Sequence, residues 1–406
     1  MSDSVLHGID LSGKTILLGV TGGIAAYKSC ELVRLLQKCG ARVKVVMSQH
    51  ATEFVGPTTF RALTHETVSV GLFDDPSDPI HHISLAQEPD LVVVAPATAN
   101  IIAKMAHGIA DDLISTTLLA TSKPLLIAPA MNDGMWKAPT TRENVAVLKA
   151  RGVNFVGPGK GYLACGSLDE GRMSEPSEIA FAAIQLLSDR DDYCGKRVLI
   201  TAGPTHEPID PVRYIGNRSS GRMGIALATA ALFRGAAVTL VLGPSDLYVP
   251  AGCDVIHVQT ASDMLEAAEK AFDHCDVAIC AAAVADYTPR HPADHKMKKA
   301  LEPLDTIELV ETADILAHLS AEKADRAVVG FAAETNDVVS FAQQKLLRKH
   351  CDLIVANDVS RSDSGFGSDT DKAWFVTADG IEELPVLSKR ALADRILDTV
   401  SQTFLK

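Results

Sequence analysis

The chain opens twice with the same short pattern, and this repetition limits the folds that it can adopt. Gly13-Lys14-Thr-Ile-Leu-Leu-Gly-Val-Thr-Gly-Gly starts one half, and Gly195-Lys196-Arg-Val-Leu-Ile-Thr-Ala-Gly-Pro-Thr starts the other. Each is a short apolar run, typical of a strand, that breaks into glycine before a helical pattern. A strand, a turn and a helix repeated in this way predict two doubly wound, Rossmann-like α/β domains.

The helices and strands after these openings have recognisable limits. Apolar residues at helical spacing run over Ile24–Gly40 and over Gly224–Gly235, and the strands Val43–Met47 and Val238–Leu242 come next. Nearly continuous apolar runs of this kind suit parallel strands that are covered on both faces. Further strands are expected at Leu91–Ala95, Leu125–Ala128, Asn154–Val156, Val277–Ala281, Ala327–Phe331, Leu353–Ala356 and Ala373–Val376.

The two halves meet at a short charged stretch. Ser188-Asp-Arg-Asp-Asp-Tyr-Cys-Gly195 interrupts the apolar pattern and ends in glycine. We therefore expect one domain over residues 1–190 and the other over residues 191–406. A chain of 406 residues with 47% hydrophobic residues can bury two sizeable cores.

Charge and cysteine usage exclude several classes of protein. Lys and Arg number 38 against 51 Asp and Glu, a formal net charge of −13, which argues against a nucleic-acid-binding scaffold with a basic face. The eight cysteines form no Cys-x-x-Cys pair, which indicates a reduced protein without structural zinc. The start lacks the features of a signal peptide, and no apolar run approaches the ~20 residues of a membrane span, so we expect a cytoplasmic protein.

Small polar residues follow several strands of the first half. Gly22 and Gly23 lie where a strand turns into a helix, so their backbone amides can hold a phosphate at the positive helix end. The spacing is not that of a dinucleotide fingerprint, and an ordinary tight turn explains it equally well. Because ligands gather at the carboxyl ends of such strands, the crevice suits a mononucleotide such as FMN. Further candidates for this crevice are Ser48, Thr98, Asn100, Asp112, Ser115, Thr116 and Thr117.

Three more side chains in this half each admit two interpretations. His82, one of a His-His pair before a strand, is a surface or cap residue or a functional base; no ligand spacing supports a metal there. Asn132 is a turn former after Pro129 or a functional amide at a strand end. Cys165, in a glycine-rich loop, is a small buried hydrophobe or a thiol on a lid.

In combination, these motifs resemble those of the phosphopantothenoylcysteine decarboxylases, over residues 20–175. The matching stretches are Thr-Gly-Gly-Ile-Ala-Ala-Tyr-Lys, Ala-Pro-Ala-Thr-Ala-Asn, Pro-Ala-Met-Asn-x-x-Met-Trp and Ala-Cys-Gly-x-x-x-x-Gly-Arg-Met, together with His82. The resemblance implies that His82 is the active-site base, that Asn132 binds the substrate carboxylate, and that Cys165 donates a proton from a substrate clamp. The family's clamp often reads Cys-Gly-Asp-x-Gly-x-Gly-Arg, so the loop shape here stays open.

The same resemblance implies FMN as the cofactor and substrate contacts from Met135 and Arg172. A simple α-amido acid does not lose carbon dioxide readily, because the carbanion has nowhere to spread. Flavin can oxidise the cysteinyl thiol to a thioaldehyde, after which decarboxylation leaves an enethiolate. A cysteine with an unperturbed pKa of ~8.5 stays largely protonated and can supply the final proton.

The second opening leads into a long polar loop, and a loop of this length is usually functional. Ser219-Ser220-Gly221 stands just before a helix, as an anion site or an ordinary cap. Downstream, Asp286 ends a strand, and Lys296 belongs to a lysine cluster that would otherwise be a solvated face. Lys345 and Lys349 lie four apart on a helix, so both can point one way. Together these groups suit a triphosphate with Mg²⁺.

This half, over residues 195–400, resembles the bacterial phosphopantothenate–cysteine ligase domain. The resemblance implies that CTP activates the phosphopantothenate carboxylate as an acyl-cytidylate, with Asn217 holding the intermediate and Lys296 covering it from a flap. The cytidine would meet backbone near Ala282 and Phe331, and Asp314, in Thr-Ala-Asp-Ile where relatives have Asn-Pro-Asp-Ile, would lie at the nucleotide. CTP rather than ATP follows from the resemblance alone. The substrate-binding residues implied are Arg213, Ala282, Asp286, Asp314, Phe331, Lys345 and Lys349.

We therefore predict a fused enzyme of coenzyme A synthesis that acts on phosphopantothenate, cysteine and CTP, without nucleic-acid or membrane partners. Two alternatives stay open: a decarboxylase of peptides that end in cysteine, and an inactive FMN-binding regulatory subunit. The second domain argues against the first, and the joint presence of His82, Asn132 and Cys165 against the other. The family's trimers of decarboxylase domains and dimers of ligase domains imply a homo-oligomer, up to a dodecamer.

Overall fold

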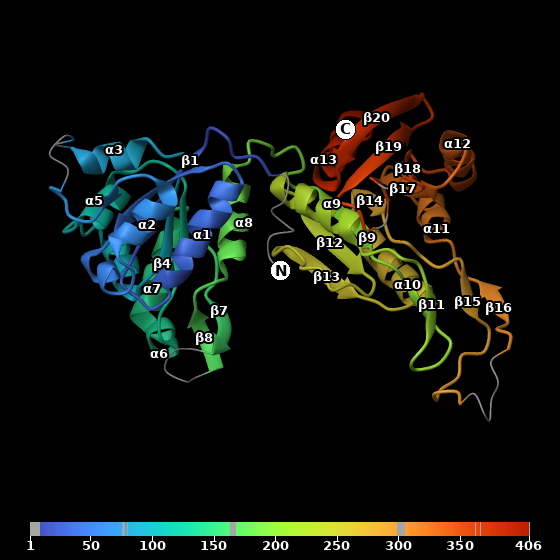
Figure 1. Cartoon of the computed structure of the whole chain (residues 1–406), viewed down its shortest axis with the longest axis horizontal. Helices are drawn as coiled ribbons and strands as arrows, with labels where there is room; N and C mark the ends of the chain where they lie inside the picture. Colours follow the sequence, from blue (N-terminus) through green and yellow to red (C-terminus); the bar gives the residue numbers. More distant parts are fainter. Residues whose placement is uncertain are drawn as a thin grey trace. The chain divides into compact units, whose positions relative to one another are not determined.

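A computed structural model describes the chain over residues 9–74, 78, 80–162, 168–298, 305–361, 363–365 and 367–405. The chain divides into two compact units, Ile9–Ser188 and a second that starts at Asp189 (Figure 1). Each unit is built around its own parallel or mostly parallel sheet, as the repeated opening predicts.

The first unit contains a six-stranded sheet in the order β3-β2-β1-β4-β5-β6, and all of its strand pairs are parallel. Every residue of β4 is buried, which explains why its sequence is a continuous apolar run instead of an alternating one. The strands are β1 (Thr15–Val20), β2 (Arg42–Met47), β3 (Val68–Ser69), β4 (Leu91–Ala97), β5 (Leu125–Pro129) and β6 (Asn154–Phe155).

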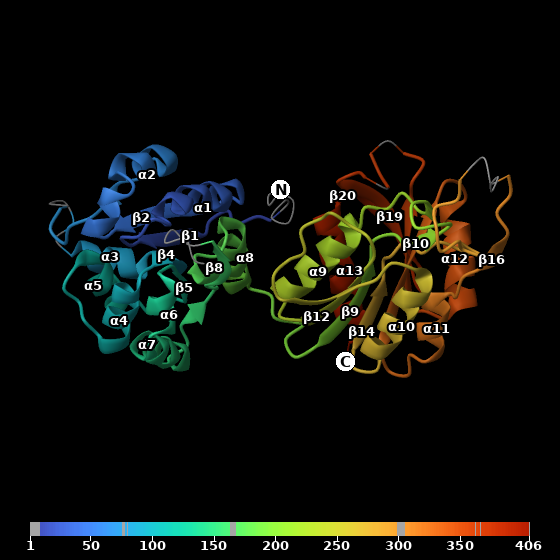
Figure 2. The ribbon, with the colours of Figure 1, turned by 90° about the horizontal axis from the view of Figure 1, so that it is seen from below.

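Helices cover both faces of this sheet (Figure 2). α1, α2 and α8 pack on one face, while the other carries an apolar core shared with α3, α4, α5 and α7. A hairpin of β7 (Gly159–Tyr162) and β8 (Leu168–Arg172) comes after the sheet. The helices are α1 (Ala26–Lys38), α2 (Pro57–Thr64), α3 (His81–Gln87), α4 (Ala99–His107), α5 (Leu113–Ala120), α6 (Asp133–Lys137), α7 (Pro139–Ala150) and α8 (Pro176–Leu187).

The second unit has an eight-stranded sheet in the order β13-β12-β9-β14-β17-β18-β19-β20. Its pairs are parallel up to β18, and the last two strands run antiparallel. The strands are β9 (Arg197–Ala202), β12 (Ala237–Leu242), β13 (Cys253–His257), β14 (Val277–Cys280), β17 (Ala327–Glu334), β18 (Leu353–Asp358), β19 (Thr370–Val376) and β20 (Ile381–Ser388).

In this unit α9 and α13 pack together on one face, and α10, α11 and α12 share an apolar core on the other (Figure 2). Two small hairpins, β10–β11 and β15–β16, extend from loops at the carboxyl ends of strands. The remaining elements are α9 (Arg222–Phe233), α10 (Ala261–Phe272), α11 (Ile315–Ala321), α12 (Val338–Lys349), α13 (Lys389–Thr403), β10 (His206–Pro208), β11 (Tyr214–Gly216), β15 (Tyr287–Pro289) and β16 (Leu309–Glu311).

The start of the second unit is anchored by a buried aromatic residue. Tyr193 is fully buried, and its hydroxyl donates to the Leu397 carbonyl oxygen over 2.8 Å. Beside it, the buried guanidinium of Arg234 lies between the carboxylates of Asp192 and Asp398. The stretch that the sequence marks as a boundary is therefore attached to α9 and α13 of the second unit.

The predicted fold class is confirmed, and two local expectations need correction. Ala373–Val376 was expected to be parallel, but β19 pairs antiparallel with β18 because a loop without a crossover helix joins them. Asp286 was expected at the end of a strand, but β14 ends at Cys280, so Asp286 lies in the loop beyond it. The long loop before α9 contains a hairpin, β10–β11, that was not predicted. Within the described residues, no helix has the length and apolar character needed to cross a membrane.

Candidate active sites

Hydroxyl groups gather at the carboxyl ends of β1, β2 and β4 in the first unit. The buried Thr21 hydroxyl donates to the Pro96 carbonyl oxygen over 2.7 Å and accepts from the Thr98 amide over 3.1 Å. Ser48 accepts from the Ala51 amide over 3.2 Å, and Thr98 caps α4. Since Ser48 and Thr98 use their oxygens as acceptors here, their hydroxyl hydrogens can still be donated to a ligand.

Gly22 and Gly23 form the turn between β1 and α1. A side chain at Gly22 would place its Cβ only 2.4 Å from the Cβ of His50, so this turn tolerates glycine alone. The turn leads into the N-terminus of α1, a 13-residue helix whose first backbone amides carry partial positive charge. This geometry fits a phosphate held by amides and hydroxyls.

The remaining cofactor candidates differ in their surroundings. Asn100 is exposed in the first turn of α4. Ser115 is buried and forms a capping box with Asp112, donating its amide to that carboxylate over 2.8 Å. Thr116 donates its hydroxyl to the Asp112 carbonyl oxygen over 2.7 Å. The structure thus gives Ser115 and Thr116 a clear part in starting α5.

Asn132 is the N-cap of α6, directly after β5. Its Oδ1 accepts from the Gly134 amide over 2.8 Å, so the turn-forming interpretation holds for this oxygen. β8 lies alongside, because the Met131 amide donates to the Gly171 carbonyl oxygen over 3.0 Å. A Cβ at Gly171 would come within 2.4 Å of the Met131 carbonyl oxygen, so only glycine permits this approach. Met135, on α6, is 49% exposed.

Arg172, at the end of β8, belongs to a charged network. Its guanidinium donates to Glu175 Oε1 over 2.8 Å, and the buried ammonium of Lys28 donates to the same oxygen over 2.9 Å. Lys28 belongs to α1 and Arg172 to β8, so Glu175 connects α1 to the β7–β8 hairpin. Cys165 lies outside the described residues, and in the sequence it falls between β7 and β8.

The two neighbouring histidines of α3 have different partners. The His81 ring contacts Ser69 Oγ at 2.6 Å and Asp78 Oδ2 at 3.3 Å, which indicates a structural role. His82 is half-buried, and its ring has no hydrogen-bond partner within the described part of the chain. Its ring nitrogens therefore remain available for a ligand.

A cleft of about 990 Å³ opens at the carboxyl ends of β9, β14, β17 and β18 in the second unit. It contains seven of the nine residues predicted for the ligase site. The residues brought together are Asn217, Ala282, Asp286, Asp314, Phe331, Lys345 and Lys349. Ser219, Ser220 and Gly221, which precede α9, also line it, so the N-terminus of a 12-residue helix faces the same space.

Two lysines of α12 supply positive charge to this cleft. Lys345 donates to the Phe331 carbonyl oxygen over 2.7 Å, and burial lowers the pKa of its ammonium. Lys349 pairs with Asp314, the N-cap of α11. Burial acts to raise the pKa of Asp314, but the hydrogen bonds from Lys349 and the Ala317 amide outweigh it and lower that pKa. In this cleft the ammonium of Lys349 is therefore neutralised by the carboxylate of Asp314. The ammonium of Lys345 is hydrogen-bonded to a neutral carbonyl oxygen instead.

Asn217 is held by the segment after β14. Its Nδ2 donates to the carbonyl oxygens of Ala283 and Val284, over 3.1 and 3.0 Å. Because both amide hydrogens are used in this way, the orientation of the side chain is set by backbone, and Oδ1 remains as its free acceptor.

Arg213 and Lys296 do not line the cleft. Arg213 Nε donates to Asp210 Oδ2 over 3.0 Å, and its guanidinium also donates to the Met297 carbonyl oxygen over 3.3 Å. The hydrogen bond from Arg213 is the main reason that the pKa of Asp210 is lowered. Lys296 is exposed beside this contact. The structure thus groups Arg213 with the Lys296 segment, apart from the other predicted residues.

The chain matches two family models in succession. Residues 5–188 match the Flavoprotein family, and residues 193–404 match the DNA/pantothenate metabolism flavoprotein C-terminal domain. A relative from Bacillus subtilis, the Coenzyme A biosynthesis bifunctional protein CoaBC, is 46% identical over 96% of this chain and 97% of its own length. The protein of the same name from Vibrio cholerae is 46% identical over 97% and 99%.

This chain belongs to the bifunctional coenzyme A biosynthesis proteins. It is an enzyme with a decarboxylase and a ligase activity in that synthesis. It is also similar to the crystal structure of the C-terminal domain of such a protein, at 41% identity over 52% of this chain and 97% of the other, with a TM-score of 0.45.

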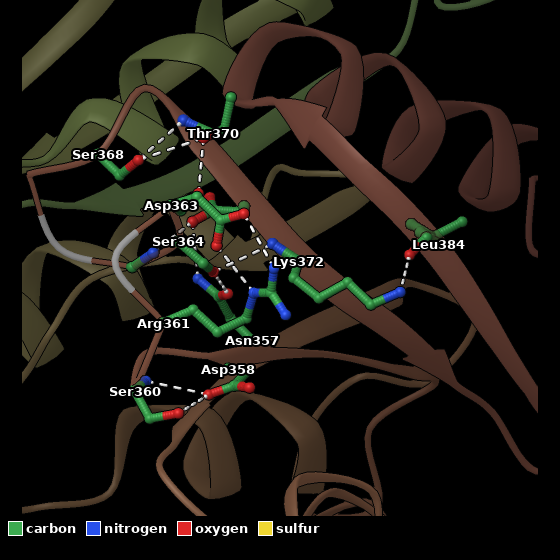
Figure 3. Close-up of polar contacts among 12 residues, drawn as sticks. Asn357, Asp358, Ser360, Arg361, Asp363, Ser364, Ser368, Thr370, Lys372 and Leu384 are labelled. Atoms are coloured by element: carbon green, nitrogen blue, oxygen red, sulfur yellow. Dashed lines mark hydrogen bonds and ion pairs between the residues drawn. The ribbon is translucent and has the colours of Figure 1, made fainter.

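Several residues that line the cleft of the second unit were not predicted from the sequence. Arg222, Asn357, Gly365, Asp371 and Lys389 all line the cleft. Asn357 and its neighbours form a polar network between β18 and β19 (Figure 3). An amide such as Asn357 near the end of a strand could have indicated a binding site. Asp371 and Lys389 could not be placed beside it, because β19 was expected to be parallel and α13 was not predicted. Among the described residues, no cluster of three or more His, Cys, Asp or Glu could hold a metal ion.

Proposed function

We propose that the second unit joins 4′-phosphopantothenate to L-cysteine with CTP, and that the first unit decarboxylates the product to 4′-phosphopantetheine with FMN. The observation that carries the proposal is the cleft of the second unit, which combines cationic side chains with a helix N-terminus. Such a combination suits a nucleoside triphosphate. The family membership supplies the reaction in which the triphosphate is used.

In the ligase reaction, the substrate carboxylate attacks the α-phosphorus of CTP, and pyrophosphate leaves. Lys345, Lys349 and the amides at the start of α9 would neutralise phosphate charge as it develops. The cysteine amine then attacks the acyl carbon, and CMP leaves. Asn217, fixed by two backbone carbonyls, would hold the acyl-cytidylate for this attack.

The other substrate contacts of this unit are also proposals. Backbone near Ala282 and Phe331 would meet the cytidine, with Asp286 and Asp314 close by. Lys296, exposed in the segment beside Arg213, would cover the intermediate, and Arg213 would contact phosphopantothenate. Mg²⁺ would enter with the nucleotide phosphates, which can supply its oxygen ligands.

In the first unit, Gly22, Gly23, Ser48 and Thr98 would hold the FMN phosphate, since amides and hydroxyls converge there without a side chain in the way. The other cofactor contacts proposed are Asn100, Ser115 and Thr116. When bound, FMN supplies the oxidation of the cysteinyl thiol and the later return of a hydride.

The protein groups would bind the substrate and move its protons. His82, whose ring is free within the described residues, would take the thiol proton as general base. Asn132 Nδ2 would bind the carboxylate that is lost, beside Met135 and Arg172. Cys165 would give the final proton to the enethiolate carbon.

We further propose that the domains run over residues 1–190 and 191–406, and that the enzyme works in the cytoplasm. The seven cysteines within the described residues are all free, which suits a reducing compartment. Trimers of the first domain and dimers of the second, combined in a dodecamer, are the proposed assembly. Neither a peptide-modifying enzyme nor an inactive FMN-binding subunit would need the cleft of the second unit.

Mass analysis of products tests this function. With phosphopantothenate, cysteine and CTP but no FMN, we expect pyrophosphate, CMP and phosphopantothenoylcysteine. With FMN added, we expect 4′-phosphopantetheine and carbon dioxide. Absence of any CTP-dependent amide product would contradict the ligase proposal, and an unchanged amide product in the presence of FMN would contradict the decarboxylase proposal.

A further inference from the structure

A buried carboxylate stands at one end of the cleft in the second unit. Asp371, in β19, is only 2% exposed and lines the cleft. Its Oδ1 accepts from Asn357 Nδ2 over 2.9 Å and from the Gly365 amide over 3.0 Å. Its Oδ2 accepts from the Lys389 ammonium over 2.6 Å. One carboxylate thus ties together the end of β18, the loop after it and the start of α13.

The Asn357 side chain is fixed from its other end as well. Its Oδ1 accepts from the Ser364 hydroxyl over 2.7 Å, and Ser364 Oγ in turn accepts from the Lys372 amide over 3.0 Å (Figure 3). An amide group has two N–H donors and two acceptor sites. One of each remains on Asn357, and this side chain lines the cleft.

The same cleft is also lined by the helix N-terminus that is proposed to bind phosphates. Arg222, the first residue of α9, donates to the Gly367 carbonyl oxygen over 2.8 Å and pairs with Asp369 over 2.7 Å. Arg222 thus links the start of α9 to the loop that follows Asn357. A phosphate bound by the α9 amides would occupy the cleft that Asn357 also lines.

We propose that Asp371, with Lys389 as its counter-charge, is a positioning residue that orients Asn357 toward the nucleotide phosphates in the ligase reaction. This inference rests on the proposed nucleotide site. Burying the charged pair of Asp371 and Lys389 costs desolvation free energy. Hydrogen bonds to the buried charged groups offset that cost. Both oxygens of Asp371 accept hydrogen bonds, from three donors in all. The amide of Asn357 is thereby fixed, and a fixed amide loses less freedom on binding a ligand.

The test is a double-mutant cycle in the full-length enzyme. We expect Asp371→Ala to raise the KM for CTP about tenfold, since a buried hydrogen bond to a charged group is lost, with kcat within about threefold. Asn357→Ala should raise this KM by a similar factor. In the Asn357→Ala background, Asp371→Ala should add less than about twofold, because both changes act through one amide.

Asp363→Ala is the matched control, because this carboxylate is exposed, lies on the same loop, pairs with Arg361 and does not line the cleft. We expect it to change the KM for CTP by less than about twofold. Should Asp371→Ala fail to fold, Lys389→Met removes the counter-charge, and the same cycle applies to it. Asp371→Asn keeps the Oδ1 acceptor that holds Asn357, so it should change the KM for CTP by less than about threefold.

Two results would overturn the inference. One is an equal effect of the Asp371 change with and without Asn357, and the other is an Asn357→Ala enzyme with the parent KM. Pyrophosphate release by the parent enzyme with CTP separates this failure from failure of the proposed function. If the parent enzyme releases none, the nucleotide site itself is wrong and the inference falls with it.

Discussion

The two units begin with the same strand–turn–helix pattern and differ in the connection between their first strand and first helix. In the first unit, residues 21–25 alone connect β1 to α1, and the turn packs so tightly that Gly22 cannot carry a side chain. In the second, residues 203–221 separate β9 from α9 and include the hairpin β10–β11. The sheet determines at which edge a ligand binds, while the length of this connection determines how the ligand is surrounded.

The chemistry available at the two edges differs accordingly. Ser48 and Thr98 present hydroxyls that also cap the helices after them. The second unit presents lysines and a free helix N-terminus around a cleft of about 990 Å³. One edge suits a single phosphate held by neutral donors, and the other suits a triphosphate held by charge. Substitutions that reduce one activity and leave the other unchanged would test whether the two edges act separately.

The largest effect is expected for His82→Asn. Loss of a general base should slow decarboxylation by about 10²- to 10⁴-fold, with no reduced flavin formed, while the ligase activity persists. Stopped-flow flavin absorbance and CTP-dependent pyrophosphate release would be measured on the same sample. Loss of both activities would show that the units do not act separately or that His82 is structural.

Cys165→Ser should act later in the same reaction, by about 10²- to 10³-fold on the final product. A serine hydroxyl is a much weaker acid than a thiol, so carbon dioxide should be released while reduced flavin and an oxidised enethiol accumulate. Mass spectrometry of the quenched mixture would identify that species. A normal yield of phosphopantetheine would refute the proton-donor role.

Asn217→Asp probes the other edge. A carboxylate at this position loses both donors to the Ala283 and Val284 carbonyls and places negative charge beside those oxygens and the acyl phosphate. We expect the cytidylate to form and accumulate while amide formation slows by about 10²-fold. The cytidylate would be detected by mass spectrometry before cysteine is added. Turnover at the parent rate would contradict the assignment, and decarboxylation of supplied phosphopantothenoylcysteine is the control.

The smallest effect is a change in pH dependence. Burial lowers the pKa of Lys345, so this ammonium loses its charge at a lower pH than an ordinary lysine. The KM for CTP should therefore rise a few-fold as the pH increases through that lowered pKa. Lys345→Arg should flatten the profile, because a guanidinium stays protonated. Superimposable profiles for parent and variant would mean that Lys345 does not contact the nucleotide.

Much of the fold could be predicted from the sequence, because buried parallel strands require continuous apolar runs and helices require spaced ones. The hairpin β10–β11 could not, since its short polar strands contain Pro208 and lack an apolar alternation. The predicted site residues came from motifs, and the motifs end before β19. Asp371 and Lys389 were missed because burial of a charged pair depends on which elements meet in space, and that information is not local.

The attachment of Tyr193 has a practical consequence for isolating one activity. A shortened chain that begins at Gly195 would omit a fully buried aromatic ring and uncover the apolar surface of α9 and α13. It would also remove Asp192, one of two carboxylates that flank the 3% exposed Arg234 side chain. Burial of a large aromatic side chain contributes about 1.5–3 kcal/mol, so truncation there would lower the yield of folded ligase. A truncation that starts just after Ser188 keeps Asp192 and Tyr193 with the second unit, whose helices α9 and α13 they contact.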